Sequence, residues 1–279
     1  MKKIGFIDYY LDEWHANNYP AFIAERSGGK YAVSSAYAAI DAPHGMTNAQ
    51  WSEKYKIPLK NSIEEVIEES DVLIVLSPDN PEQHPFLCEK PFRSGKPVYV
   101  DKTFSTDEKT AKELFAIAES HATPCFSSSA LRFSSELSVF NVPEIACLYS
   151  EGPGFYDIYS IHQIEPIVAL MNTPVKKVMF TGNKKHPSMI LSFADGRFAH
   201  MVQRNDPEHS FRLTAVNEKN DATTVEIRSD YMRLFIDAML TFFDTGLSTV
   251  SHAQTVEVMA IRCAGERAMR EPFSWISTE

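Results

Sequence analysis

The sequence has no long hydrophobic run and no cluster of positive charge. No apolar stretch among its 279 residues approaches the roughly 18–20 residues that a membrane helix needs. The formal net charge is −10 with no Lys/Arg-rich segment, so nucleic acid and anionic membrane surfaces are poor electrostatic partners. The amino terminus, MKKIGFIDYY, lacks the long apolar region and the small-residue cleavage site of a signal peptide. We therefore expect a cytoplasmic protein with neither a nucleic-acid nor a membrane partner.

Cysteine is also scarce, and the chain contains no internal repeat or low-complexity linker. The four cysteines are far apart and lie in apolar or helical contexts: Cys88, Cys125, Cys147 and Cys263. That spacing favours buried free thiols over disulfides or a zinc site, and we predict no bound metal. With 44% hydrophobic and 23% charged residues, the composition is that of a globular protein with one large or two modest domains.

The segment Asp71–Lys102 predicts one strand–helix–strand unit. Val72–Leu76 is short, apolar and rich in β-branched residues, which is typical of a strand buried on both faces. A turn follows it, then a segment suited to a single helix from Glu82 to about Arg93, and then a second strand at Pro97–Val100. Polar residues cluster just after the carboxyl ends of both strands: Ser77, Asp79, Asn80, Asp101 and Lys102. Ligands bind at this edge in open parallel sheets, so the sequence predicts a site here.

The rest of the first 127 residues alternates strands and helices in the same way. Further strands are predicted at Lys3–Asp8, Tyr31–Ala38 and Thr123–Phe126, and helices at Ala21–Arg26, Thr47–Tyr55, Ile63–Glu69 and Glu108–His121. Such alternation is typical of a doubly wound parallel sheet.

After residue 127 the pattern changes from alternation to consecutive strands. A helical connection is predicted at Ala130–Phe140, and helices at Ile161–Met171, Tyr231–Phe243 and Ala253–Met269. Strands are predicted at Glu144–Tyr149, Lys177–Thr181, Ser188–Phe193, Arg197–Val202, Phe211–Asn217 and Thr223–Arg228. An Asp-Gly hairpin turn joins two of them at Ala194–Arg197. We predict an α/β domain at 1–127 and an α+β domain with a mostly antiparallel sheet at 128–279.

Several motifs in order resemble one family. The segment Gly95–Lys102, GKPVYVDK, resembles the aGKPVxxEKP signature of the Gfo/Idh/MocA oxidoreductases. The capping-box helix that opens at Ser62, the Ser77-Pro78 strand end, the Leu131–Phe133 segment and the two closing helices around Gly246 follow in family order. The resemblance covers nearly the whole chain. It implies a Rossmann-type domain that binds NAD or NADP, a dehydrogenase that acts on a sugar or polyol derivative, and a homo-oligomer formed through the C-terminal sheet.

The resemblance also implies catalytic roles for two residues. Lys102 matches the lysine of the EKP triplet, which contacts the nicotinamide ribose and the substrate hydroxyl. His162 matches the histidine of the D-x-G-x-H-x-x-D motif, the usual proton acceptor, and Glu165 matches the last acidic position of that motif. Physically, oxidation of a carbinol needs a base of near-neutral pKa, and a nearby lysine can stabilise the developing alkoxide.

Further site residues are expected from the same alignment. Ser77, Pro78 and Asn80 match the backbone beside the cofactor ribose, and Asp8 and Asp101 complete the predicted cofactor-binding set. The predicted substrate-binding set is His15, Asp157, Glu165 and Arg132. Asn17 and Asn18 either line the pocket or form a polar helical turn, and a ribose-binding Asp41 and a site-facing His84 are further possibilities.

The chain departs from the family pattern at three places. The EKP triplet is Asp101-Lys102-Thr103, and the motif aspartate falls on Ile158, one position beyond Asp157. The loop after the first strand, DYYLDE, has no G-x-G-x-x-G, and its bulky and acidic side chains oppose a diphosphate. A dinucleotide therefore binds in a changed pose or does not bind.

Two other function classes follow from these departures. One is a ligand-binding or regulatory protein that has lost its redox activity. The other is a non-redox lyase or isomerase that uses His162 as its base. The three-residue spacing of His162 and Glu165 also suits metal ligands, but no second spaced pair accompanies it.

Overall fold

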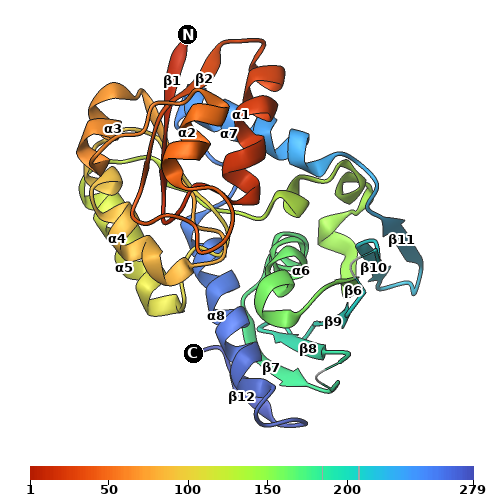
Figure 1. The fold of residues 1–279 in the computed structure, drawn as a ribbon. Coiled ribbons are helices and arrows are strands. Elements are labelled where there is room, and N and C mark those ends of the chain that lie inside the picture. The colour runs from red at the N-terminus through yellow and green to blue at the C-terminus, as the bar shows by residue number, and fades with distance from the viewer. Residues whose placement is uncertain (184, 207) are drawn as a thin grey trace. The chain divides into compact units, whose positions relative to one another are not determined.

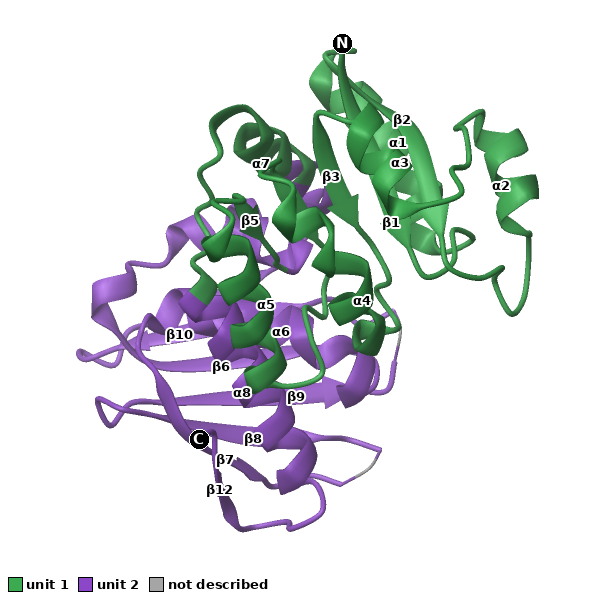
Figure 2. Ribbon diagram, turned by 90° about the vertical axis from the view of Figure 1, so that its left-hand side faces the viewer, with its two compact units in different colours: residues 1–128, 236–252 green, residues 129–235, 253–279 purple. Residues whose placement is uncertain are grey.

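The computed structural model describes residues 1–183, 185–206 and 208–279, which form two compact units (Figures 1 and 2). Unit 1 comprises Met1–Ser128 and Ile236–His252, and unit 2 comprises Ser129–Phe235 and Ala253–Glu279. The first boundary lies one residue from the predicted one. Residues 236–252, which the predicted division places in the second domain, instead group with unit 1.

Unit 1 is built on a five-stranded parallel sheet in the order β2-β1-β3-β4-β5. Its strands are β1 (Lys2–Asp8), β2 (Tyr31–Ala38), β3 (Val72–Val75), β4 (Val98–Val100) and β5 (Cys125–Phe126). Its helices are α1 (Trp14–Ser27), α2 (Asn48–Tyr55), α3 (Ile63–Glu69), α4 (His84–Glu89), α5 (Glu108–Ser120) and most of α7 (Tyr231–Thr245). Every residue of β3 and β4 is buried, as expected for central parallel strands. The predicted Rossmann-type parallel sheet is confirmed.

Local capping fixes where several of these helices begin. Ser62 Oγ accepts a hydrogen bond from the backbone N–H of Glu65 at the start of α3, at 3.2 Å. Asp107 Oδ1 does the same for Thr110 at the start of α5, at 2.8 Å. Side-chain oxygens at these positions satisfy N–H groups that have no partner inside the helix. The predicted starts of α3 and α5 are therefore confirmed.

Two predicted helices differ from the structure because of proline. The helix predicted at Glu82–Arg93 is broken into α4 and two flanking 3₁₀ turns, Pro81–Gln83 and Pro91–Arg93. Pro91 has no N–H to donate, and its ring opposes continuation of a helix. Conversely, α1 begins at Trp14 and continues through Pro20, seven residues before the predicted start at Ala21.

The connection predicted at Ala130–Phe140 also differs from a regular helix. It consists of the 3₁₀ turns Ala130–Phe133 and Ser135–Val139, and a third turn follows at Val142–Glu144. Ser134 separates the first two turns because its backbone is extended, with φ of −60° and ψ of 131°.

Unit 2 contains a seven-stranded sheet in the order β11-β10-β6-β9-β8-β7-β12. Its strands are β6 (Ile145–Pro153), β7 (Val175–Phe180), β8 (Ser188–Phe193), β9 (Phe198–Arg204), β10 (Arg212–Asn217), β11 (Ala222–Glu226) and β12 (Trp275–Ser277). Its helices are α6 (Tyr156–Met171) and α8 (His252–Ala268). All neighbours pair antiparallel except β6 and β9, which are parallel. The mostly antiparallel sheet is confirmed, and β12 is an edge strand that sequence patterning did not predict.

Two further observations concern membrane helices and cysteines. Within the described ranges, no helix combines the length and apolarity that crossing a membrane requires. Cys88, Cys125 and Cys147 are free thiols. The cytoplasmic location stays a prediction.

The close approach of β1 to α3 depends on Gly5. A methyl group at this position would overlap the Val66 and Ser70 side chains, both of which are buried. Gly5→Ala is therefore expected to lower the free energy of unfolding by about 1–3 kcal/mol, the usual cost of overpacking. Urea unfolding measures this change. Lys3→Ala, at an exposed position on the same strand, is the control and should change stability little; equal stability of both variants would contradict this packing.

Candidate functional site

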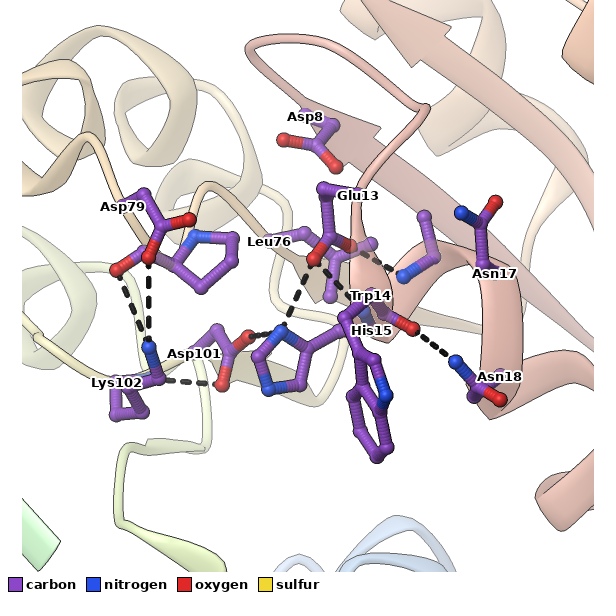
Figure 3. Close-up of polar contacts among 12 residues, drawn as sticks. Asp8, Glu13, Trp14, His15, Asn17, Asn18, Leu76, Asp79, Asp101 and Lys102 are labelled. Atoms are coloured by element: carbon purple, nitrogen blue, oxygen red, sulfur yellow. Dashed lines mark hydrogen bonds and ion pairs between the residues drawn. The ribbon is translucent and has the colours of Figure 1, made fainter. Parts of the chain in front are cut away.

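The predicted polar edge of unit 1 exists, and three adjacent strands supply it (Figure 3). Asp8 is the last residue of β1, Ser77 follows β3 by one residue after Leu76, and Asp101 follows β4 directly. These strands are parallel neighbours, so their carboxyl ends meet at one edge of the sheet. Asp8 and Asp101 are each only 1% exposed. The edge therefore places buried carboxyl groups where this type of fold binds ligands.

Glu13 closes the amino-terminal end of α1. Its Oε2 accepts a hydrogen bond from the backbone N–H of His15 at 2.7 Å, and its Oε1 accepts one from the N–H of Ala16. The positive end of a helix dipole and these first-turn N–H groups are what bind phosphate in dinucleotide-binding loops. Here the protein's own carboxylate satisfies them.

The loop before α1 is also fixed by side chains that leave little room. Leu11 is fully buried, and its N–H donates to Asn48 Oδ1 at 3.1 Å. Asp12 accepts hydrogen bonds from the N–H of Met46 at 2.6 Å and from Asn17 Nδ2 at 2.9 Å. With Glu13 on the helix end, the loop residues do not fit a diphosphate in the usual position.

Asp8 is a buried carboxyl group with an incomplete set of partners. Its Oδ1 accepts from the N–H of Tyr9 at 2.7 Å, whereas its buried Oδ2 has no hydrogen-bond partner among the described residues. Burial raises the pKa of Asp8 well above its ordinary value, and the negative charges of Glu13 and Asp101 raise it further. A protonated Asp8 is thereby favoured in the folded protein.

His15 lies between two carboxylates. Its Nδ1 is 3.1 Å from Glu13 Oε2 and 3.3 Å from Asp101 Oδ2 (Figure 3). Burial lowers the pKa of His15, but Asp101 and Glu13 outweigh burial and leave that pKa above its ordinary value. The Lys102 charge acts in the opposite direction. His15 was predicted to bind substrate, and the structure places its ring at the predicted edge.

Lys102 follows Asp101 and is 9% exposed. Its Nζ lies 3.8 Å from Asp79 Oδ1 and 3.5 Å from the Pro78 carbonyl oxygen, and its N–H donates to Asp101 Oδ1 at 2.8 Å. The Tyr99 hydroxyl lies 3.0 Å from the same Asp101 oxygen. Asp101 thus links the lysine backbone on one side to the imidazole of His15 on the other.

The turn after β3 is held by its own contacts. Ser77 has a positive φ of 78°, and its Oγ donates to the Asn80 carbonyl at 3.1 Å. Asn80 Nδ2 donates to Glu82 Oε1 at 3.0 Å, and Pro78 is buried. The structure brings these predicted cofactor-binding residues to the polar edge, while their role toward a cofactor stays a prediction.

Other polar residues near the edge have local structural partners. The buried ring of His84 contacts the carbonyl oxygens of Phe104 at 2.9 Å and Leu76 at 2.6 Å, and burial lowers its pKa. Asn18 Nδ2 donates to the Trp14 carbonyl, as a polar first turn does. Asp41 Oδ1 accepts from the N–H of Asn48 at 2.7 Å.

In unit 2, His162 and Glu165 of α6 form a second polar group with Ser129 and Arg132, which lie before β6. His162 Nδ1 is 2.7 Å from Ser129 Oγ. Glu165, 2% exposed, accepts from the N–H of Ser129 at 3.3 Å and forms an ion pair with Arg132 at 3.2 Å. Arg132 also donates to Gln254 Oε1 at 2.6 Å. Glu165 and Arg132, both predicted to bind substrate, therefore contact each other.

The remaining predicted residue of unit 2 is Asp157, in the exposed first turn of α6. Its carbonyl oxygen accepts from Arg262 Nη2 at 2.9 Å. Ile158, at the position of the family aspartate, is 48% exposed. The substrate roles of these residues and the pairing of Lys102 with His162 stay predictions.

Sequence reasoning missed two contributions to these sites. Glu13 was predicted only to add negative charge, because glutamate is not among the residues that usually cap a helix at this position. Ser129, the partner of His162, stands in a run of three serines and had no signal of its own.

Solved structures share this fold across the whole chain. Apo scyllo-inositol dehydrogenase from Lactobacillus casei has a TM-score of 0.79 at 13% identity, covering 99% of this chain and 98% of that one. UDP-N-acetylglucosamine 3-dehydrogenase GnnA from Acidithiobacillus ferrooxidans has a TM-score of 0.75 at 13% identity, covering 96% and 99%. GenD2 from gentamicin A biosynthesis, solved in complex with NAD, has a TM-score of 0.78 at 9% identity, covering 99% and 97%.

No family model and no curated protein matches the chain. The likeness shows a fold shared with dehydrogenases, and membership in the Gfo/Idh/MocA family stays a prediction.

The buried Asp8 makes stability depend on pH. The folded state holds its proton more tightly than the unfolded state, so this group's contribution is favourable at low pH and is lost as pH rises above the unfolded pKa. Asp8→Asn is expected to raise the free energy of unfolding at pH 7–8 by about 1–3 kcal/mol, the range for an uncompensated buried polar group.

Denaturant unfolding at pH 4 and at pH 8 measures this effect, and the gain should shrink at the lower pH. Glu68→Gln, at an exposed carboxyl on α3, is the control and should give no such pH-dependent difference. If Asp8→Asn lost stability at pH 8, the view that the buried Asp8 carboxylate is unfavourable at that pH would be wrong.

Proposed function

We propose that the chain is an enzyme that acts on a hydroxylated small molecule, such as a sugar or polyol derivative, as an oxidoreductase. The observation that carries the proposal is Lys102, held beside Asp101 at the carboxyl edge of the parallel sheet. The whole-chain likeness to sugar and inositol dehydrogenases supports it. The resemblance of Gly95–Lys102 to the family signature adds independent support.

Two side chains would handle the proton and the charge. His162, with Nδ1 on Ser129 Oγ, would take the substrate hydroxyl proton, because imidazole titrates near neutral pH. The Lys102 ammonium would stabilise negative charge that develops during the reaction. Asp157, Glu165 and Arg132 would bind or orient the substrate in unit 2.

The hydride acceptor under this proposal would be NAD or NADP. The α1 end does not fit its diphosphate, so the dinucleotide would bind without using the N–H groups that Glu13 occupies. Ser77, Pro78, Asn80, Asp8 and Asp101 would then be its neighbours at the polar edge.

Cofactor binding gives the first test of the oxidoreductase proposal. NAD, NADH, NADP and NADPH are each titrated to millimolar concentration while thermal unfolding is followed. A binding dinucleotide should raise the unfolding temperature, and saturation at about 100 times the dissociation constant corresponds to about 2.7 kcal/mol. ATP serves as the control for general nucleotide binding, and Lys102→Gln should weaken the response to the true cofactor. No response to any of the four would reject hydride transfer.

A second candidate is a non-redox member of the fold, and Glu13 on the α1 end favours it. This protein would be either a ligand-binding or regulatory protein, or a lyase or isomerase that uses His162 as its base. Mass spectrometry of the protein as isolated separates the classes, because a co-purified dinucleotide would exclude the non-redox candidate. Full turnover by His162→Ala would exclude a lyase or isomerase based on that residue.

We further propose that the chain forms a homo-oligomer through the outer face of the unit 2 sheet. Alternate residues on β6 and β9 face away from α6, and they include Tyr149, His200 and Phe198. Tyr149 is 47% exposed, Phe198 is 41% exposed, and the Tyr149 and His200 rings stack at 4.9 Å. Exposed aromatic residues on a sheet face are typical of protein–protein contacts.

The same face carries charges of both signs, which suits contact with a second copy. Arg212 contacts Glu151 at 2.9 Å and Glu226 at 3.3 Å. A twofold contact requires a surface complementary to itself, and paired charges around exposed aromatics meet that requirement.

Light scattering after size exclusion tests the assembly. The wild type is expected to run at twice the 31.5-kDa chain mass or more. Tyr149→Glu combined with Phe198→Glu should shift it to the monomer, because charges would then be buried in the interface. Phe86→Glu, at a 52% exposed aromatic on α4, is the matched control and should keep the wild-type mass. A monomeric wild type would refute the assembly.

A further inference from the structure

The imidazole of His15 is arranged like the histidine of a carboxylate–histidine catalytic pair. Glu13 Oε2 forms a hydrogen bond with Nδ1 at 3.1 Å, which holds the ring proton there, and Asp101 Oδ2 lies 3.3 Å from the same nitrogen at ion-pair distance without a hydrogen bond (Figure 3). No partner of Nε2 lies among the described residues, and Nε2 is not one of the buried side-chain atoms without a partner. With its proton on Nδ1, the neutral ring presents a basic, accessible Nε2.

Neighbouring side chains hold the ring in this orientation. Trp14 and Tyr19 contact it edge-on, each with ring centroids 5.2 Å away. Glu13 also binds the backbone N–H of His15, so the residue is fixed at both its backbone and its side chain. The side chain keeps 14% of its surface exposed, which leaves one edge open. A fixed ring with one open nitrogen suits proton transfer.

We propose that His15 is an acid/base residue at the edge of unit 1, and that with Lys102 it transfers protons at the carbon next to a carbonyl of a hydroxylated ligand, without a nicotinamide. Glu13 is the positioning residue that binds the Nδ1 proton, and Asp101 adds a negative charge beside it. The proposal shares with the proposed function its class of ligand and the Lys102 ammonium, but neither His162 nor a nicotinamide.

The surrounding charges fit this chemistry. The titratable groups that face His15 are Glu13 at the N-cap of α1, Tyr19 on α1, and Asp101 and Lys102 after β4. Asp101 and Glu13 stabilise an imidazolium once it forms, whereas Lys102 destabilises it and favours return of the proton. Lys102 also provides a positive charge for an oxyanion at the same edge.

A plainer interpretation makes His15 a residue of the first helical turn. A helix amino terminus disfavours a positive charge, so a histidine there gains nothing from the dipole. Two carboxylates at Nδ1 with Nε2 left open go beyond what capping requires, since Glu13 alone satisfies the N–H groups of His15 and Ala16.

The proton-transfer step is balanced without an oxidant. The C–H bond next to the carbonyl breaks, and its proton moves to His15 Nε2. Its electron pair forms the C=C bond of an enolate, whose negative oxygen faces the Lys102 ammonium. The imidazolium exchanges that proton with solvent through its open edge and then delivers one to the same carbon, which restores the ligand, so in D₂O the carbon gains deuterium.

Deuterium exchange in dihydroxyacetone tests this step. The protein is freed of nucleotides, and loss of the methylene proton signal in D₂O is followed by NMR. The wild type is expected to accelerate exchange, and His15→Gln to reduce that acceleration by about 100-fold, within the usual range for a general base. His121→Gln, at an exposed histidine after α5, is the matched control and should retain the wild-type rate.

The pH profile distinguishes proton transfer from a structural role. Exchange should rise with pH as His15 loses its proton. The midpoint should move down in Asp101→Asn, because a negative neighbour is removed, and up in Lys102→Gln, because a positive one is removed. NMR titration of the His15 ring reports the same shifts independently of any ligand. His15→Asn provides a second variant if His15→Gln does not fold.

Two results would overturn the proposal. One is a wild type that does not accelerate exchange, and the other is a His15 variant, folded by circular dichroism, that exchanges at the wild-type rate. The test is independent of the oxidoreductase proposal, because exchange without any response to nicotinamide cofactors rejects that proposal and supports this one.

Discussion

The site of unit 1 depends on one interaction, the contact of the Glu13 carboxylate with the first-turn N–H groups of α1. These groups form the strongest anion-binding feature that a parallel α/β sheet offers at its edge. When a residue of the chain occupies them, the edge loses its usual affinity for phosphate and gains a fixed negative charge. Because Glu13 takes the place of a bound anion at the helix end, the polar edge beside it is acidic.

The fixed charge sets the behaviour of its neighbours. Burial raises the pKa of Asp8, and Glu13 and Asp101 raise it further, whereas His15 is held between the same two carboxylates. Lys102 lies at the far side of Asp101, near Asp79. Acidic and basic groups thus alternate along the edge, and residues with perturbed pKa values in such a group are typical of functional sites. The fold is that of dehydrogenases, but the chemistry of this edge is the chain's own.

Much of the architecture could be predicted because its signals are local. The apolar run at Val72–Val75 and the caps Ser62 and Asp107 each fixed an element within a few residues. The first part of α1, Trp14–Pro20, was missed because Pro20 normally ends a helix, and the break at Pro91 was missed because its flanks favour helix. The edge strand β12 pairs with β7, about one hundred residues earlier in the chain, and such a non-local pairing leaves little trace in a three-residue segment.

The position of the polar edge could be predicted from the sequence, but the contacts between its side chains could not. Strand ends located Asp8, Ser77 and Asp101 at one edge, because parallel neighbours must end together. Which carboxylate oxygen meets which ring nitrogen depends on the path of the Tyr9–Glu13 loop, and no periodicity encodes that path. In unit 2, the contact of Glu165 with Arg132 joins residues 33 apart in the sequence and required the fold to be known.

Unit 1 is discontinuous in sequence, and this affects how the protein reaches its native state. The first half of the chain lacks the part of α7 whose Asp237 and Asp244 contact Arg26, Lys30 and Tyr31. A ribosome must therefore release more than 100 further residues before the amino-terminal sheet acquires its last covering helix. The nascent amino-terminal segment leaves apolar surface uncovered during that interval, which makes it a natural client for chaperones.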